Sequence, residues 1–193
     1  MSRTVFLRLE WLLSAALILF SFLWAWLRDL PLTALLVPTV PNVVTGVVAG
    51  ALLWSTIPLV LRAPSMRRVW NQVLLPFSGT LGPRDIAVIA ALSGITEELF
   101  FRGVLMPEIG IVLSSLGFGA LHALCAVYFA WATLVGAGFG ALALAGGSLV
   151  TPIVAHATYN LGALLWLRHS ARTAVPPTAP GIAATIASPH GIG

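Results

Sequence analysis

Long apolar stretches separated by short polar segments dominate the pattern of this chain. About 20 consecutive apolar residues are needed to cross the hydrocarbon core of a bilayer as a helix. Clusters of proline, glycine and arginine mark the breaks between the stretches. We expect six spans, at residues 9–27, 43–61, 85–107, 109–124, 127–145 and 149–167. The pattern therefore predicts an all-α polytopic membrane protein.

The remaining segments are short. The first apolar run is longer than the ~7–15 residues of a signal-peptide core, so we expect it to be a retained span. Residues 62–83 combine arginines with Trp70 and Phe77, which favours a segment lying at the membrane interface rather than crossing it. Residues 173–193 consist of small residues and proline, which is typical of a disordered tail. We therefore predict a single transmembrane domain over residues 1–172.

Composition and charge agree with this class. The chain is 59% hydrophobic and 8% charged, whereas soluble domains carry about 25% charged residues. All basic residues are arginines, and they lie at span ends rather than in a dense patch, so the pI of about 10.6 does not indicate nucleic-acid binding. One cysteine, Cys125, allows neither an internal disulfide nor a cysteine metal cluster. Absence of lysine suggests a GC-rich prokaryotic genome, and hence a prokaryotic plasma membrane.

Arginine placement predicts the orientation. Six spans place both termini on one side of the membrane. The N-terminus, the segment between the second and third spans, and the C-terminal end carry most of the arginines, while the opposite loops carry Arg28 with Asp29 and Glu108. Because positive residues accumulate on the cytoplasmic side, we expect both termini in the cytoplasm.

Ionisable and strongly polar residues within the spans are confined almost entirely to three short motifs. The first motif contains Glu97, Glu98 and Arg102, the second ends at His122, and the third joins His156 to Asn160. On insertion scales each charge near the bilayer centre costs roughly 2.5–3.5 kcal/mol, so residues of this kind face a protein interior and are functional by default. These six residues are the candidate site.

Helical spacing relates the motif residues to one another. Glu98 and Arg102 are four residues apart, which predicts an ion pair on one helix face. Glu97 points about 100° away from Glu98, so the two carboxylates need not share a partner. Phe118 precedes His122 by one turn and is expected to pack beneath it. Glycines and alanines next to the motifs would let the helices approach closely.

This set of residues has the parts of a hydrolytic site. A carboxylate beside an imidazole, here Glu97 and His122, can act as a general base on a water molecule. A second imidazole and a carboxamide, here His156 and Asn160, can donate hydrogen bonds to an oxyanion. The sequence has no Gly-x-Ser-x-Gly motif, so direct attack by water is the natural mechanism. Two histidines and a glutamate could alternatively bind zinc, but the usual His-Glu-x-x-His spacing is absent, and we predict no cofactor.

The ordered motifs Glu-Glu-x-x-x-Arg, Phe-x-x-x-His and His-x-x-x-Asn resemble those of the CAAX prenyl protease and bacteriocin-processing family (CPBP, also called Abi). The resemblance covers about residues 85–165 and implies an intramembrane glutamic endopeptidase with a catalytic core of four helices. It implies that Glu97 and His122 activate the water, that His156 and Asn160 form the oxyanion hole, and that Glu98 and Arg102 complete or brace the site. Substrates implied by the family are membrane-anchored proteins or peptides, cleaved in CAAX-type processing, peptide maturation or removal of C-terminal sorting tails.

Other functions fit the same residues. A non-catalytic membrane scaffold or a bacteriocin self-immunity protein would use them to hold helices together. A small transporter would use Glu97 to carry protons, but the sequence shows no inverted repeat. In straight helices Glu97 lies about 18 Å from the start of its span, whereas His122 lies near the end of its own. We therefore expect misplaced helix ends, or a tilted or broken span around a water-filled cavity.

Overall fold

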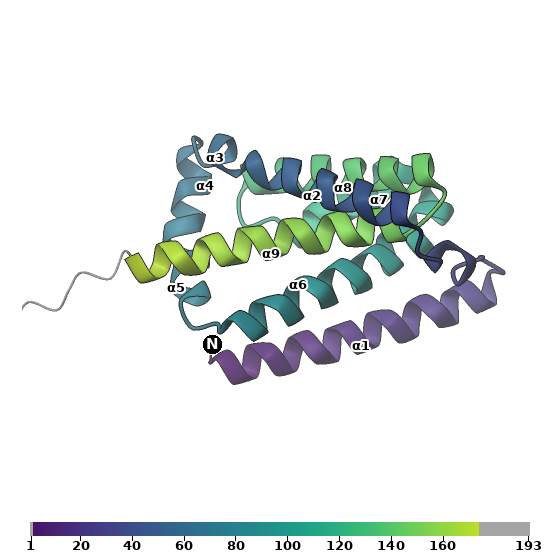
Figure 1. Ribbon diagram of the computed structural model, residues 1–193, viewed down its shortest axis with the longest axis horizontal. Helices are drawn as coiled ribbons and strands as arrows, with labels where there is room; N and C mark the ends of the chain where they lie inside the picture. Colours follow the sequence, from purple (N-terminus) through teal and green to yellow (C-terminus); the bar gives the residue numbers. More distant parts are fainter. Residues whose placement is uncertain (1, 174–193) are drawn as a thin grey trace, which may run out of the picture.

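The structure, a computed structural model, describes residues 2–173, which fold into a bundle of long helices closed at one end by shorter ones (Figure 1). The long helices are α1 (Arg3–Leu27), α2 (Val40–Ser55), α6 (Pro83–Glu98), α7 (Met106–Leu121), α8 (Ala126–Gly146) and α9 (Val150–Thr173). A short 3-10 helix, η1 (Ala34–Leu36), lies in the connection between α1 and α2. No strand occurs within residues 2–173, so the predicted all-α membrane fold is confirmed.

Four helical stretches are long and apolar enough to cross a membrane. They are Arg3–Leu27, Val40–Val60, Pro83–Leu121 and Ala126–Gly146. Helix α9 has 24 residues and is about 36 Å long, which is also sufficient. Its apolar character is reduced by polar residues such as His156 and Asn160, which face the interior of the bundle.

The stretch Pro83–Leu121 does not cross the membrane as one straight rod. Gly110 has φ 82° and ψ 166°, a backbone conformation that is essentially restricted to glycine, and it breaks the helix. The rings of Phe101 and Phe118 lie 5.1 Å apart, although these residues would be about 25 Å apart in a straight helix. The chain therefore reverses at Gly110, which separates the third and fourth predicted spans.

The predicted span 109–124 is wrong as a complete crossing. After Gly110, α7 continues only to Leu121, which corresponds to about 17 Å, or roughly half the hydrocarbon thickness of a bilayer. Residues 122–125 then lead into α8, whose N-terminal end approaches the short helices at the closed end of the bundle. The helix thus ends earlier than its hydropathy predicts, which shortens this element.

Short helices between α2 and α6 run across the end of the bundle (Figure 1). They are α3 (Ile57–Val60), α4 (Pro64–Val69), the π-helical η2 (Trp70–Leu74) and α5 (Leu75–Ser78), and we call residues 57–78 the cap. Trp70 is buried and its ring centroid lies 5.0 Å from that of Trp166 on α9. The predicted interfacial segment thus also packs into the bundle and covers its interior.

Two ion pairs fix helix α1 parallel to the segment 83–109. At the cap end, Arg3 binds both carboxylate oxygens of Asp85 at 2.7 Å, and Asp85 also accepts a hydrogen bond from the backbone N–H of Gly82. At the opposite end, Arg28 binds Glu108 at 2.9 and 3.2 Å. Because both pairs form at once, the axial register of α1 against α6 is set at its two ends.

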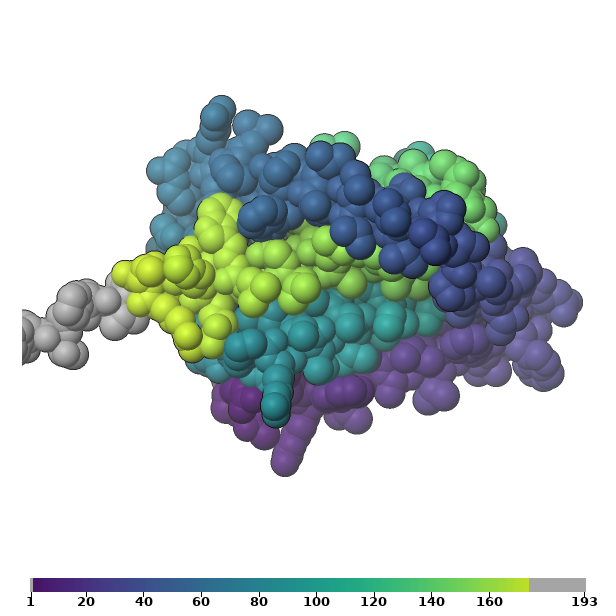
Figure 2. Space-filling model, in the orientation of Figure 1, coloured from purple at the N-terminus to yellow at the C-terminus, as the bar shows by residue number. Residues whose placement is uncertain are grey.

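Helix α9 packs between α2 and α6, as the space-filling view shows for the yellow-green helix between the blue and teal ones (Figure 2). On the α2 side, a Cβ atom at Gly46 or Gly50 would lie within 3 Å of backbone oxygens of α9. On the α6 side, a Cβ atom at Gly94 would lie about 3 Å from backbone atoms of α9. Small residues thus allow the close approach that brings the side chains of α9 to those of α6.

The N-terminus and the C-terminal end of α9 lie at the same end of the bundle (Figure 1). This arrangement agrees with the predicted placement of both termini on one side of the membrane. The predicted disordered tail, 173–193, falls outside the described residues except for Thr173, which is the last residue of α9.

Candidate active site

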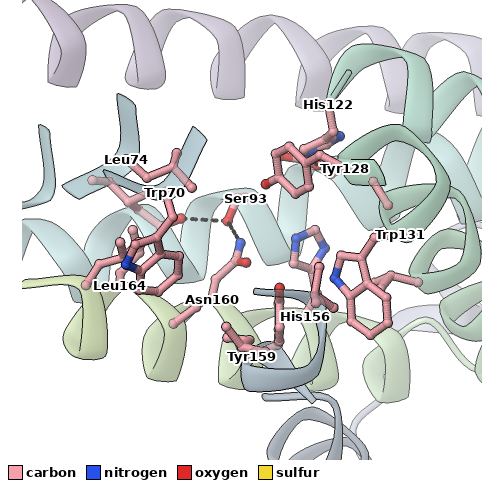
Figure 3. A pocket seen from close by; sticks show the side chains of 18 of the residues that line it. Trp70, Leu74, Ser93, His122, Tyr128, Trp131, His156, Tyr159, Asn160 and Leu164 are labelled. Atoms are coloured by element: carbon pink, nitrogen blue, oxygen red, sulfur yellow. Dashed lines mark hydrogen bonds and ion pairs between the residues drawn. The ribbon is translucent and has the colours of Figure 1, made fainter. Parts of the chain in front are cut away.

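A cavity of about 430 Å³ lies inside the bundle, beneath the cap. One side of it is apolar and is formed by the cap and by α9, with Trp70, Leu74 and Leu164 among its residues (Figure 3). The other side carries most of the polar groups. Its polar side chains from α6, α9 and the end of α7 are Ser93, Glu97, His122, His156 and Asn160. The polar motifs of the sequence therefore converge on one cavity.

Glu97 and His122 face each other across the cavity. The distance between Glu97 Oε2 and His122 Nε2 is 3.7 Å, too long for a direct hydrogen bond. His122 is the first residue after α7, and Glu97 lies about 21 Å along its helix from Pro83. The break at Gly110 and the early end of α7 thus bring His122 to the depth of Glu97. A broken span was one of the arrangements expected from the sequence.

The His122 ring has a fixed orientation. Its Nδ1 lies 2.8 Å from the backbone oxygen of Phe118, which can only accept, so Nδ1 donates. The imidazole also stacks on the Phe118 ring, with centroids 4.4 Å apart, as its helical spacing predicts. In the neutral ring, Nε2 therefore presents a lone pair toward Glu97, whose Oε2 is buried and has no hydrogen-bond partner in the described part of the chain.

Glu98 forms a buried cluster behind the cavity wall. Its side chain is fully buried, and Oε1 accepts hydrogen bonds from Arg102 Nη1 at 2.9 Å and from His156 Nδ1 at 2.8 Å. Arg102 also donates to the backbone oxygen of Gly136 at 2.8 Å. The predicted Glu98–Arg102 pair is present, and its link to His156 on another helix adds a contact that the sequence pattern did not reveal.

Local structure explains why Arg102 reaches Gly136. Arg102 lies in η3 (Leu99–Leu105), a π-helical segment that follows α6 directly. Its guanidinium lies 4.6 Å from the centroid of the Phe118 ring, a favourable cation–π contact. At Gly136 a Cβ atom would come within 3.2 Å of Arg102 Nη2. The glycine therefore leaves room for the guanidinium as well as accepting its hydrogen bond.

Asn160 is held by Ser93, a residue that the motif analysis missed. Asn160 Nδ2 donates to Ser93 Oγ at 2.8 Å, and Ser93 Oγ in turn donates to the backbone oxygen of Ile89 at 2.8 Å (Figure 3). Ser93 precedes Glu97 by one helical turn, so both side chains lie on the cavity face of α6. That spacing was the signal that could have identified it. The second N–H of the Asn160 amide is not used by Ser93.

His156 is oriented by contacts on two sides. Its ring stacks on Phe139, with centroids 5.0 Å apart, and Nδ1 donates to the Glu98 carboxylate. Only 5% of the His156 side chain is exposed. With Nδ1 committed to Glu98, Nε2 is the atom left for a ligand in the cavity that His156 lines.

All six predicted site residues thus lie in or directly behind one cavity. Four of them line it, and Glu98 and Arg102 support it from behind. A further carboxylate, Glu10 of α1, also lines the cavity. Glu10 lies outside the three sequence motifs, although an ionisable side chain within a predicted span is itself a signal of function. No group of three or more His, Cys, Asp or Glu side chains suited to a metal ion occurs in the described region.

The fold and the site together define a polytopic helical membrane protein with a buried Glu/His pair and an amide donor around one cavity. Residues 81–162 match the family model of Rce1-like proteins, described as type II CAAX prenyl endopeptidases. This match to the Rce1-like family agrees with the resemblance of the motifs. No curated protein and no solved structure matches the chain. The family identifies a CAAX-type membrane endopeptidase, and the matched segment contains all six candidate residues.

Proposed function

We propose that the protein hydrolyses a peptide bond in a membrane-associated substrate by direct attack of water, without a cofactor. The observation that carries this proposal is the 3.7 Å separation of Glu97 Oε2 and His122 Nε2, two atoms of residues that line the same cavity. Both atoms are acceptors when Glu97 is ionised and His122 is neutral, so their direct approach is unfavourable. A single water that donates one hydrogen to each atom relieves this conflict and bridges them.

A water held by two acceptors presents its oxygen lone pair to a substrate carbonyl. As the C–O bond forms, Glu97 takes the water proton and acts as the general base. The same proton is then transferred to the amine nitrogen as the C–N bond breaks, which restores the ionised carboxylate. His122 keeps the water aligned, because Phe118 fixes its ring.

The oxyanion would be stabilised by Asn160 and His156. Asn160 has one amide hydrogen free after its hydrogen bond to Ser93. His156 donates from Nε2 only as an imidazolium, because Nδ1 already donates to Glu98. The Glu98 carboxylate supports that cation directly. In this proposal Glu98 and Arg102 position His156 and do not contact the substrate.

The decisive experiment compares the wild type with Glu97→Gln and His122→Ala in detergent or nanodiscs, using a library of membrane-anchored peptides read by mass spectrometry. Loss of a general base lowers the rate by about 10²–10⁴-fold. Glu108→Gln and His169→Gln remove the same chemical groups outside the cavity and should retain activity. Cleavage at the native rate by Glu97→Gln would refute the mechanism.

Two further outcomes separate the alternatives. If a chelator abolishes cleavage and zinc restores it, the histidines act through a metal ion. If no peptide is cleaved although the wild type and the variants are equally folded, a scaffold or self-immunity role becomes the better explanation. The position of the cut in a cleaved peptide would identify the substrate as CAAX-type, a maturing peptide or a sorting tail.

A further inference from the structure

Glu10 is a carboxylate in the cavity that the proposed mechanism does not use. It lies on α1, one helical turn after Phe6, and both side chains line the cavity. No ion pair within residues 2–173 involves Glu10. It is partly buried, and its side chain lines the same cavity as that of Glu97. A carboxylate in this setting lacks the counter-ion that a membrane-embedded charge normally has.

The two ion pairs at the ends of α1 allow the position of Glu10 to be calculated relative to Glu97. Arg3 is level with Asp85, and the helices run parallel. At a rise of 1.5 Å per residue, Glu10 lies about 10 Å from this level and Glu97 about 18 Å. Glu10 is therefore about 8 Å nearer the cap end than the general base. Since an extended peptide advances 3.2–3.4 Å per residue, this distance corresponds to about two or three residues.

The charge of the cavity is unbalanced. Among the described residues that line it, Glu10 and Glu97 are the carboxylates, and neither arginine nor any other permanent cation is present. Arg102, the nearest guanidinium on α6 and η3, is committed to Glu98 and Gly136. His156, which is 95% buried, aims an unpaired Nε2 into the same cavity. The His156 imidazole and the Glu10 carboxylate therefore remain available to a ligand, and Glu10 has no protein partner of opposite charge in the cavity.

We infer that Glu10 is a specificity-determining residue that binds a cationic group of the peptide substrate, a lysine or arginine side chain within about three residues of the scissile bond. The inference rests on the proposed endopeptidase function. A substrate cation would neutralise Glu10 and reduce its repulsion with Glu97. An anionic group at the same position would add to the repulsion and be disfavoured.

The test measures binding and cleavage separately. Peptides carry lysine, norleucine or glutamate at each position up to three residues on either side of a cut site. Binding is measured in nanodiscs on full-length protein with a His122→Ala background, so that no peptide is consumed. We expect the best lysine peptide to bind about tenfold more tightly than its norleucine counterpart, and Glu10→Gln to abolish this preference. Glu108→Gln, which removes a carboxylate outside the cavity, should keep it.

The binding results test the role of Glu10, and the cleavage results test the endopeptidase function. A lysine preference that persists in Glu10→Gln, or the absence of any preference at all positions, overturns the role of Glu10. In the cleavage assay, the lysine preference should appear in kcat/KM of the wild type and of Glu108→Gln, and it should be lost in Glu10→Gln. If lysine peptides bind through Glu10 but no peptide is cut, the cationic specificity stands and the endopeptidase function fails.

Discussion

At the residue scale, the most consequential contact is the one made by Glu98. A single carboxylate oxygen joins Arg102, four residues along the same segment, to His156 on α9. Buried charges are tolerated only when they are paired and hydrogen-bonded. Because Arg102 and Glu98 neutralise each other, the cluster can be fully enclosed and still orient a histidine at the cavity.

Removal of one partner from this cluster should destabilise the protein strongly. Glu98→Ala leaves the buried Arg102 cation uncompensated, and we expect a loss of about 3–5 kcal/mol of stability. Thermal or denaturant unfolding in detergent measures the effect. The matched change at the solvent-exposed pair, Glu108→Ala beside Arg28, should have a much smaller effect, because surface ion pairs contribute little to stability. If both variants lost the same amount of stability, the buried cluster would contribute no more to stability than the exposed pair.

At the scale of elements, glycines decide how close the helices come. Gly46 and Gly50 on α2 form a small-x-x-x-small pattern, and a Cβ atom at either position would lie within 3 Å of a backbone oxygen of α9. Helix α9 carries His156 and Asn160, so its packing against α2 and α6 sets the position of both site residues. The sequence reveals this pattern on α2, but it does not reveal that α9 is the helix that packs against it.

A methyl group at Gly50 should push α2 and α9 apart. Gly50→Ala would place its Cβ against backbone and Thr158, and overpacking of this kind costs about 1–3 kcal/mol. Gly138→Ala is the matched control, because no atom lies within 4 Å of its added Cβ. That control should be neutral or stabilising by up to about 1 kcal/mol, since alanine is the better helix former. If the unfolding midpoints of Gly50→Ala and Gly138→Ala shifted by the same amount, the close approach of α2 and α9 at Gly50 would be contradicted.

Gly110 offers a second test at this scale. Its backbone conformation is essentially closed to residues with a side chain, so Gly110→Ala should cost about 1–3 kcal/mol although no atom lies near its Cβ. The reversal at Gly110 also sets the distance between Glu97 and His122, so activity should fall with stability. Wild-type stability and activity in Gly110→Ala would show that the reversal does not require glycine.

At the scale of the whole molecule, α1 begins and α9 ends at the same end of the bundle (Figure 1). Arg3 pairs with Asp85, and Arg168 donates a hydrogen bond from Nε to the backbone oxygen of Leu81 at 2.9 Å. The two terminal helices are thus both tied to the start of α6. The cap covers the same end, so it lies over the cavity on the side that the arginine bias predicts to be cytoplasmic.

Cysteine labelling can test this topology. In a Cys125→Ala background, an impermeant maleimide should label Ser2→Cys and Thr173→Cys from one side of the membrane and Thr33→Cys from the other. All three positions are exposed, and Thr33 lies in the connection between α1 and α2. In inside-out vesicles the first two sites should react and the third should not. Reaction of Ser2→Cys and Thr173→Cys from opposite sides would overturn the even number of crossings.

The sequence by itself determined the class of protein and the residues of the candidate site. Long apolar stretches are stable only in a bilayer or in the interior of a helix bundle. Polar side chains are costly in both environments, so those that occur there usually have a function. For this reason the motifs from Glu97 to Asn160 stood out, and helical spacing alone predicted the pairing of Glu98 with Arg102 and the stacking of Phe118 on His122.

Only the tertiary structure decided what depends on contacts between distant segments. Hydropathy does not reveal that α7 ends at Leu121, because the residues on both sides of this end are mostly apolar, so the sequence did not predict the depth of His122. The link from Glu98 to His156, the support of Asn160 by Ser93, and the place of Glu10 in the cavity join different helices. Their geometry follows from how helices pack and register, which side-chain periodicity within one helix does not encode.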